Sequence, residues 1–246
     1  MKKLFVLFVF CSLLCCKEKK KESLTAQQIV DKAIEVSGGD LFAKSKLTFD
    51  FRDKNYISEG LGDNGVLKRV FDLEGKKVED VKSKAKFERY IDGTLEVLHD
   101  TVANKYDNAV NSVHYFVKLP YGLNDPAVNK SLLEEVTLKG KDYYKIKVTF
   151  DQNGGGEDFE DTYLYWINKE TFKPDYLAYD FHVNGGGVRF RVAYNERYID
   201  GIRFVDYENY QPKDDVTTIN NIDTKYESGD LELLSKIELK NIYVER

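Results

Sequence analysis

The sequence predicts a mostly β protein with a few helices, in which neighbouring strands pair antiparallel. The 246 residues include 17 tyrosines and 15 phenylalanines. Both residue types favour the half-buried surface of a pleated sheet. Long stretches alternate apolar and polar residues with the period of a strand, and turn sequences such as Asp63-Asn64-Gly65 and Asp92-Gly93 separate them. Only two long segments have the spacing of an amphipathic helix. Together these observations indicate a meander of strands interrupted by helices.

The first fifteen residues have the pattern of a signal peptide. Met1-Lys2-Lys3 gives a basic start, and the apolar run Leu4–Cys15 follows it. This run has 12 residues, whereas a helix that spans a bilayer needs roughly 20. We therefore expect a leader at 1–15, a flexible lysine-rich tether at 16–23 and a single domain at 24–246.

The segment Leu13-Leu14-Cys15-Cys16 resembles the lipobox of bacterial lipoproteins, in which a signal peptidase cuts before a cysteine that carries a diacylglyceryl group. Cys16 fits best, since Leu13 lies three places before it and the small Cys15 immediately before it. Cys15 is the alternative acceptor, and an ordinary secretory signal is the competing interpretation. Acyl chains such as palmitate on Cys16 would anchor the chain, because each buried methylene contributes about 0.8 kcal/mol. No cysteine follows Cys16, so a disulfide framework is excluded.

A lipidated cysteine would place the protein in the bacterial envelope, and the membrane is its first expected partner. The tether Lys17–Glu22 is rich in lysine, unlike the acidic segment of many surface-exposed Bacteroidetes lipoproteins. We therefore expect an outer-membrane anchor that faces the periplasm. The formal net charge is −5 at pH 7, and the leader and tether are the basic part of the chain. A net-acidic domain without a basic stripe argues against a nucleic-acid partner, whose phosphates it would repel.

The domain is expected to begin with a helix at Ser23–Gly39. Thr25 and Gln28 have the spacing of a capping box, an apolar stripe follows at helical spacing, and Gly38-Gly39 provides the stop. A short helical turn is expected at 40–44. Alternation then predicts six strands, at Leu47–Arg52, Tyr56–Gly60, Val66–Leu73, Lys77–Lys82, Lys86–Asp92 and Thr94–Leu98.

A second helix is expected at Thr101–Val117, where the apolar residues fall on one helical face until Leu119-Pro120 ends the pattern. The segment Pro120–Pro126 reads as a fixed loop. The remaining predicted strands are Leu133–Leu138, Tyr143–Phe150, Thr162–Asn168, Tyr176–Val183, Val188–Tyr198, Ile202–Tyr210, Val216–Tyr226 and Leu231–Tyr243.

This order of elements is similar to that of the Lol-type lipoprotein carriers and their outer-membrane receptors, the LolA-like and LolB-like proteins. The segments His114–Phe116, Leu119–Pro126, Tyr143–Phe150 and Asp161–Thr171 resemble an uncharacterised family of Bacteroidetes lipoproteins. The resemblance implies a strongly bent antiparallel sheet, an incomplete β-barrel whose concave side is apolar and covered by helices. It implies no established activity. On this fold the helix Thr101–Val117 would plug the concave side or act as its lid.

No motif in the sequence identifies an enzyme. The three histidines, His99, His114 and His182, lack the close spacing of a zinc site, and neither glycine-rich tract is followed by Lys-Ser/Thr. No Gly-x-Ser-x-Gly elbow occurs, and the loop that starts at Asp151 lacks the glutamate that a calcium loop needs at its twelfth position. We assign no catalytic residue, no metal ligand and no cofactor. A hydrolase that uses His114 or His182 with a carboxylate is the third-ranked hypothesis.

The remaining candidate is a binding surface. If the sheet bends, one face of each strand lines its concave side, and a half-open barrel needs a helix or a ligand to fill its interior. The candidate ligand-binding residues are Phe49, Phe51, Tyr144, Ile146, Val148, Phe150, Leu177, Tyr179, Phe181, Val188, Phe190 and Val192. Tyrosine hydroxyls could hold a polar head while the rings contact an acyl chain. The competing interpretation is that these residues form the packed core between sheet and helices.

The leading functional hypothesis is therefore non-enzymatic. We expect a membrane-anchored periplasmic lipoprotein that binds a lipid, an acyl chain or another amphiphile. Burial of apolar surface would supply the free energy of binding. The alternative is an envelope interaction or assembly protein that uses a sheet edge or its acidic face. The sequence identifies no protein partner for that alternative.

Overall fold

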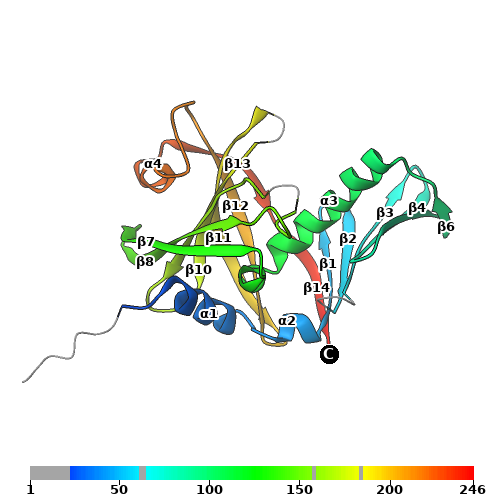
Figure 1. Ribbon diagram of the computed structural model, residues 1–246, viewed down its shortest axis with the longest axis horizontal. Helices are drawn as coiled ribbons and strands as arrows, with labels where there is room; N and C mark the ends of the chain where they lie inside the picture. The colour runs from blue at the N-terminus through cyan, green and yellow to red at the C-terminus, as the bar shows by residue number, and fades with distance from the viewer. Residues whose placement is uncertain (1–22, 61–64, 157–158, 183–184) are drawn as a thin grey trace, which may run out of the picture.

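The computed structural model describes residues 23–60, 65–156, 159–182 and 185–246. The predicted leader, the predicted lipidation site at Cys16 and nearly all of the predicted tether lie outside these residues. The described strands form two seven-stranded antiparallel sheets (Figure 1). The first sheet contains β14 (Leu239–Glu245), β1 (Lys46–Phe51), β2 (Lys54–Glu59), β3 (Val66–Leu73), β4 (Lys76–Ser83), β5 (Phe87–Ile91) and β6 (Thr94–Glu96), in that order. The second contains β13 (Leu231–Ile237), β12 (Ile202–Pro212), β11 (Gly187–Ile199), β10 (Pro174–Phe181), β9 (Tyr163–Asn168), β8 (Lys141–Phe150) and β7 (Val128–Leu138).

The two sheets are halves of one bent ribbon. Only Glu238 separates β13 of the second sheet from β14 of the first. Within the described residues, β6 and β7 each pair with a single neighbour, and they lie at opposite sides of the molecule in Figure 1. The ribbon therefore stays open, and the prediction of a bent antiparallel sheet that forms an incomplete barrel is confirmed.

A buried carboxylate fixes the corner between the sheets. Asp206 on β12 is 2% exposed. Its carboxylate accepts a hydrogen bond from Arg197 Nη2 at 2.9 Å and another from the backbone amide of Leu239 at 3.0 Å. The apolar side chains of Phe42, Leu47, Ile202 and Phe204 form the small core of this corner.

The described helices are α1 (Ala26–Val36), α2 (Leu41–Lys44), α3 (Asp100–Val117), α4 (Ile222–Ser228) and the 3-10 helix η2 (Tyr121–Asn124). Thr25 and Gln28 form the predicted capping box of α1. Gly38, just after α1, has φ +122°, and a Cβ there would come within 3.1 Å of the backbone of Gly201 and Ile202. Only glycine allows this close approach. Within the described part of the chain, every helix is too short or too polar to cross a bilayer.

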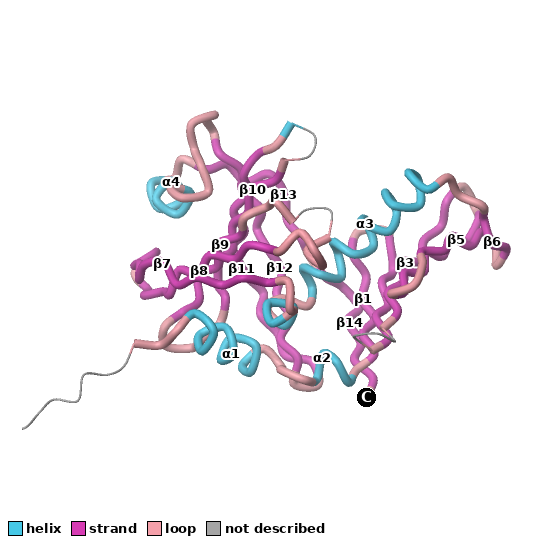
Figure 2. The backbone as a smooth tube through the Cα atoms, in the orientation of Figure 1, coloured by secondary structure: helices cyan, strands magenta, loops and turns pink. Residues whose placement is uncertain are grey.

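The central strands of the second sheet are buried on both faces. On the concave face, Ile146, Val148, Tyr165 and Leu177 pack against α1 and η2. On the other face, a second cluster packs against α4 and the segment before it; its members include Trp166, Tyr176, Ala178, Phe190 and Ile222. All six residues of β9 are consequently buried. In the tube of Figure 2, α1 and α4 flank the magenta strands of this sheet.

Three predicted elements need correction. The segment Val216–Tyr226 is not a strand, because it contains a loop and the start of α4. The long predicted strand Leu231–Tyr243 is divided into β13 and β14, which lie in different sheets. The strand predicted at Leu133–Leu138 begins earlier, at Val128, and pairs with β8 along its length.

Candidate functional site

Helix α3 crosses the space between the two sheets, as Figure 1 shows. Its N-terminal half is attached to the first sheet. The Arg89 guanidinium of β5 lies 3.5 Å from the centre of the Tyr106 ring, and Lys82 Nζ of β4 lies 2.6 Å from a carboxylate oxygen of Asp107. A cation over an aromatic face and a short ion pair both hold the helix close to these strands.

A buried ion cluster within the first sheet holds Arg89 in the position from which it contacts α3. Asp80 on β4 is fully buried, and its carboxylate accepts hydrogen bonds from both Arg69 and Arg89. Arg89 therefore has a fixed orientation, with its guanidinium between the carboxylate and the ring of Tyr106. A buried carboxylate that is fully hydrogen-bonded in this way can hold two arginines that would otherwise be unpaired.

His114 attaches the C-terminal half of α3 to the same sheet. Its Nε2 donates to the carbonyl oxygen of Lys68 at 3.0 Å, and its ring packs edge-on against Phe49 and Tyr56. Burial lowers the pKa of His114 to about 3, so the ring is neutral at physiological pH. Among the described residues, no carboxylate oxygen lies within 4.0 Å of its ring nitrogens. His114 is thus a buried packing residue rather than half of an acid–base pair.

The opposite side of α3 faces a cleft of about 370 Å³, which we call the inner cleft. Its volume falls within the range of known ligand pockets. The helix contributes Ser112, Val113, Phe116 and Val117. The strands contribute Phe51, Tyr179, Arg191, Asn209, Ser235 and Ile237, and Arg52 and Leu239 complete the lining. A smaller cavity of about 30 Å³ adjoins it and shares Phe116, Val117, Arg191, Ile237 and Leu239.

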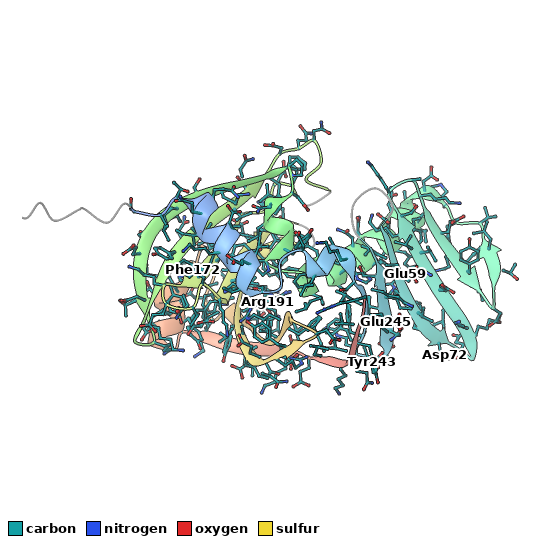
Figure 3. All side chains as sticks on the ribbon, turned by 90° about the horizontal axis from the view of Figure 1, so that it is seen from below. Glu59, Asp72, Phe172, Arg191, Tyr243 and Glu245 are labelled. Carbon is teal, nitrogen blue, oxygen red and sulfur yellow. The ribbon has the colours of Figure 1, made fainter. Side chains whose placement is uncertain are left out.

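Arg191 is the main polar feature of the inner cleft. It extends from β11 on the concave face and is 8% exposed. Its Nη2 donates to the Tyr179 hydroxyl at 3.0 Å, and its guanidinium lies 3.9 Å from the centre of the Phe116 ring. Its Nε is buried and has no hydrogen-bond partner. In Figure 3, Arg191 is labelled within the larger body, far from Glu59 and Asp72 on the first sheet.

Polar side chains continue across the floor of the inner cleft. Asn209 of β12 lies directly opposite Arg191 in the strand register, and Ser235 of β13 lies opposite Asn209. The Asn209 amide donates to the Ser235 hydroxyl at 3.3 Å, while its Oδ1 is buried without a partner. The inner cleft therefore combines apolar walls with a short polar row at its base.

Two further cavities lie along the other sides of α3. One, of about 510 Å³, has a polar lining that includes Asn104, Asn108 and Asn111. The other, of about 410 Å³, includes Lys118 and Asp125. Burial lowers the pKa of Lys118 to about 8 and raises the pKa of Asp125. Because polar groups line most of the 510 Å³ cavity, and the 410 Å³ cavity contains the charged pair Lys118 and Asp125, both suit apolar ligands less well than the inner cleft.

The structure brings only some of the predicted binding residues together at an open site. Phe51 and Tyr179 line the inner cleft, and Phe150 lines the 510 Å³ cavity. Phe181 contacts Tyr179 in an aromatic pair with ring centres 6.2 Å apart. The others on this side are packed: Tyr144, Ile146, Val148 and Leu177 in the core beneath α1 and η2, and Phe49 beneath His114.

The predicted placement of Val188, Phe190 and Val192 on the concave face is wrong. These residues belong to the cluster on the opposite face, with Trp166. The register explains the error, because Leu177 of β10 lies opposite Arg191 of β11. The concave face of β11 thus presents arginine, and its apolar residues point toward α4. Arg191 was not identified as a cleft residue from the sequence. Its place on the concave face follows only from its pairing with Leu177 on the adjacent strand.

The other two histidines lie outside the inner cleft. His99 caps the start of α3, where its Nδ1 accepts from the amide of Thr101 at 3.4 Å. The His182 Nδ1 lies 3.2 Å from a carboxylate oxygen of Asp161, with the histidine side chain 61% exposed. In the part of the chain that the structure describes, no three His, Cys, Asp or Glu side chains are grouped so that they could hold a metal ion.

Comparisons with known proteins agree with this architecture. A model of the "Family of unknown function (DUF6503)" matches residues 2–239. The chain belongs to this DUF6503 family. A LolA superfamily protein from Nitrosomonas europaea is 14% identical, with a TM-score of 0.50 over 91% of this chain and 95% of that one. A DUF1329 family protein from Desulfovibrio piger is 11% identical, with a TM-score of 0.51 over 91% and 94%. No curated protein matches the chain. The DUF6503 protein thus has a LolA-like fold, as the sequence resemblance implied.

Proposed function

We propose that this DUF6503 protein is a lipid-anchored envelope protein that binds a lipid, an acyl chain or another amphiphile in the inner cleft. The observation that carries the proposal is an apolar cleft with a polar base, located inside the bend of an open sheet. Val113, Val117 and Ile237 offer contact surface for a hydrocarbon chain. Each methylene that leaves water for such a surface contributes roughly 0.8 kcal/mol. The LolA-like fold supports the proposal.

In this proposal α3 is the movable wall of the site. Among the described residues, Arg89, Lys82 and the backbone of Lys68 connect it to the first sheet. Toward the second sheet it presents aromatic rings, and Phe116 contacts Tyr163 and Tyr179. A hydrocarbon chain can replace ring contacts of this kind at little cost, whereas it cannot replace an ion pair. The ligand would therefore enter between α3 and the second sheet.

Ligand uptake tests the proposal. Residues 23–246 contain all the described helices and strands, and native mass spectrometry of this domain should find co-purified amphiphile after expression in bacteria. A fluorescent fatty acid should bind the emptied domain. Val117→Trp should weaken uptake about fifteenfold, because an indole that displaces two methylenes removes roughly 1.6 kcal/mol. Val102→Trp is the matched control, since Val102 lies on the same helix and is 37% exposed. A domain that is purified empty and takes up no fluorescent fatty acid would contradict the proposal.

The proposed anchor is Cys16, with the acyl chains in the membrane and the tether leading to the domain. Radiolabelled palmitate should label the native chain in growing bacteria. Cys16→Ser should abolish the label, and Cys15→Ser should leave most of it. If the label survives Cys16→Ser and disappears in Cys15→Ser, the acceptor is Cys15. An unlabelled native chain would refute lipid anchoring.

The exposed edge of the second sheet favours a second candidate function, an envelope interaction or assembly protein. β7 is an edge strand of 11 residues, and Leu133 on it is 44% exposed. A long edge strand offers unpaired backbone groups to a strand of another chain. A pull-down that recovers one stoichiometric partner, which is lost when Leu133 is replaced by proline, would favour this function over amphiphile binding.

A further inference from the structure

The inner cleft contains a positive charge that no described acidic residue neutralises. Four arginines are buried in the described part of the chain. Arg69, Arg89 and Arg203 each donate to a carboxylate at 2.9 Å or less. For Arg191, by contrast, no carboxylate oxygen among the described residues lies within 4.0 Å. Arg191 is thus the exception among the buried arginines, and it is the one that lines the inner cleft.

The contacts of Arg191 leave part of its guanidinium unsatisfied. A guanidinium has five N–H donors. In the described structure one goes to the Tyr179 hydroxyl, and the Nε–H, although buried, meets no acceptor. The rings of Phe116 and Tyr179 lie 3.9 and 5.1 Å from the guanidinium carbon and provide cation–π contacts. Such contacts offset only part of the cost of removing a charge from water.

We propose that the amphiphile bound in the inner cleft is anionic and that its carboxylate or phosphate head pairs with Arg191. This inference rests on the proposed function, and it specifies the ligand class. An oxyanion in the inner cleft that accepts from the guanidinium N–H groups would give the buried charge a partner. Asn209, the neighbour of Arg191 across the strands, has its Oδ1 buried without a donor. That oxygen could accept from a hydroxyl of the same head.

The position of the head also sets the position of the chain. Val113 and Val117 of α3 line the inner cleft together with Arg191, and Ile237 faces them from β13. A ligand whose oxyanion contacts Arg191 would therefore place its first methylenes against these three residues. A neutral amphiphile could occupy the same apolar wall but would leave the guanidinium unpaired. A cationic amphiphile would be repelled by it.

Photo-crosslinking of the full chain in dodecyl maltoside, whose head is uncharged, tests this inference. The probes are a fatty acid with a diazirine in its chain and the matching fatty alcohol. We expect the acid to label peptides of the inner cleft at least about tenfold more than the alcohol, the effect of one charge-assisted pair. Unlabelled oleate, oleoyl lysophosphatidic acid and neutral monoolein serve as competitors. Stronger competition by oleate or by lysophosphatidic acid than by monoolein supports the inference and distinguishes a carboxylate from a phosphate head.

Variants complete the test. Arg191→Gln should lower labelling by the acid to the level of the alcohol and leave labelling by the alcohol unchanged. Arg189→Gln is the matched control, because Arg189 lies two residues away on the same strand and its Nη1 donates to the carbonyl of Val188. The comparison of acid with alcohol on the native chain does not depend on the folding of any variant. Equal labelling by both probes would overturn the anionic head but not the proposed function. Absence of labelling in the inner cleft with either probe would overturn both.

Discussion

Replacement of Asp80 by asparagine should destabilise the first sheet and release α3. Asp80 is fully buried, and its oxygens accept four N–H bonds, at 2.9 and 2.5 Å from Arg69 and at 2.7 and 3.0 Å from Arg89. Asparagine keeps the shape but removes the charge, so two buried guanidinium groups lose their common counter-ion. Breaking one buried ion pair costs about 3–5 kcal/mol. We expect a loss at the upper end of this range, because both arginines are 7% exposed or less.

Thermal unfolding monitored by circular dichroism measures this effect. For a domain of this size each kcal/mol shifts Tm by about 2–4 °C, so a loss of about 5 kcal/mol corresponds to roughly 10–20 °C. Glu79→Gln is the control, since Glu79 is the preceding residue on β4 and is only partly buried. We expect Glu79→Gln to lower Tm by less than about 2 °C. If Asp80→Asn and Glu79→Gln shift Tm equally, the cluster does not support the sheet as argued.

Three further perturbations follow from the described contacts. Burial holds the pKa of His114 near 3, against 6.5 in water. Between these pH values the unfolded chain binds a proton at His114 that the folded protein does not. The free energy of unfolding therefore falls by at most about 5 kcal/mol as the pH drops from 6.5 to 3. Urea unfolding should show a shallower pH dependence for His114→Gln, and an unchanged slope would refute the assignment. Asp223→Asn leaves Lys145 Nζ, 2.8 Å away and 3% exposed, without its buried counter-ion, and hydrogen exchange should show faster opening of α4. Thr25→Ala removes the cap of α1 and should cost about 1 kcal/mol in urea unfolding; a cost below about 0.3 kcal/mol would mean that packing alone defines this helix end.

Local signals in the sequence predicted most of the fold. The capping box at Thr25 and Gln28 defined the start of α1, and alternation located the strands of the meander. These signals succeed because each depends on residues within one turn or on one face of one strand. The resemblance to LolA-like proteins supplied the bend, which no periodicity encodes.

The failures occur where a side-chain hydrogen bond or a change of pairing partner overrides the alternating pattern. Val216-Thr217-Thr218-Ile219 has β-forming residues, but the carboxylate of Asp214 accepts hydrogen bonds from the amides of Val216 and Thr217 and holds them in a turn. Side-chain bonds of this kind compete with strand pairing. The break between β13 and β14 has no local marker, since the strand continues in sequence and only its pairing partner changes.

The candidate site was harder to predict for a related reason. The apolar residues of each strand were expected on its concave face. Both faces of the second sheet are covered, so this rule cannot determine which face of β11 is concave. Arg191 stands in an alternating strand and is nevertheless buried on the concave side. The pairing of Leu177 with Arg191 sets the phase, and pairing register is a tertiary property.

At Glu238 the chain passes directly from a strand of the second sheet to a strand of the first. Asp206 and Leu239 form the hydrogen bond beside this crossing. In the described part of the chain, Lys82, Arg89 and the backbone of Lys68 bind α3 to the first sheet, so the helix would follow that sheet in a rotation of one sheet against the other. The width of the inner cleft is then coupled to the angle of the corner.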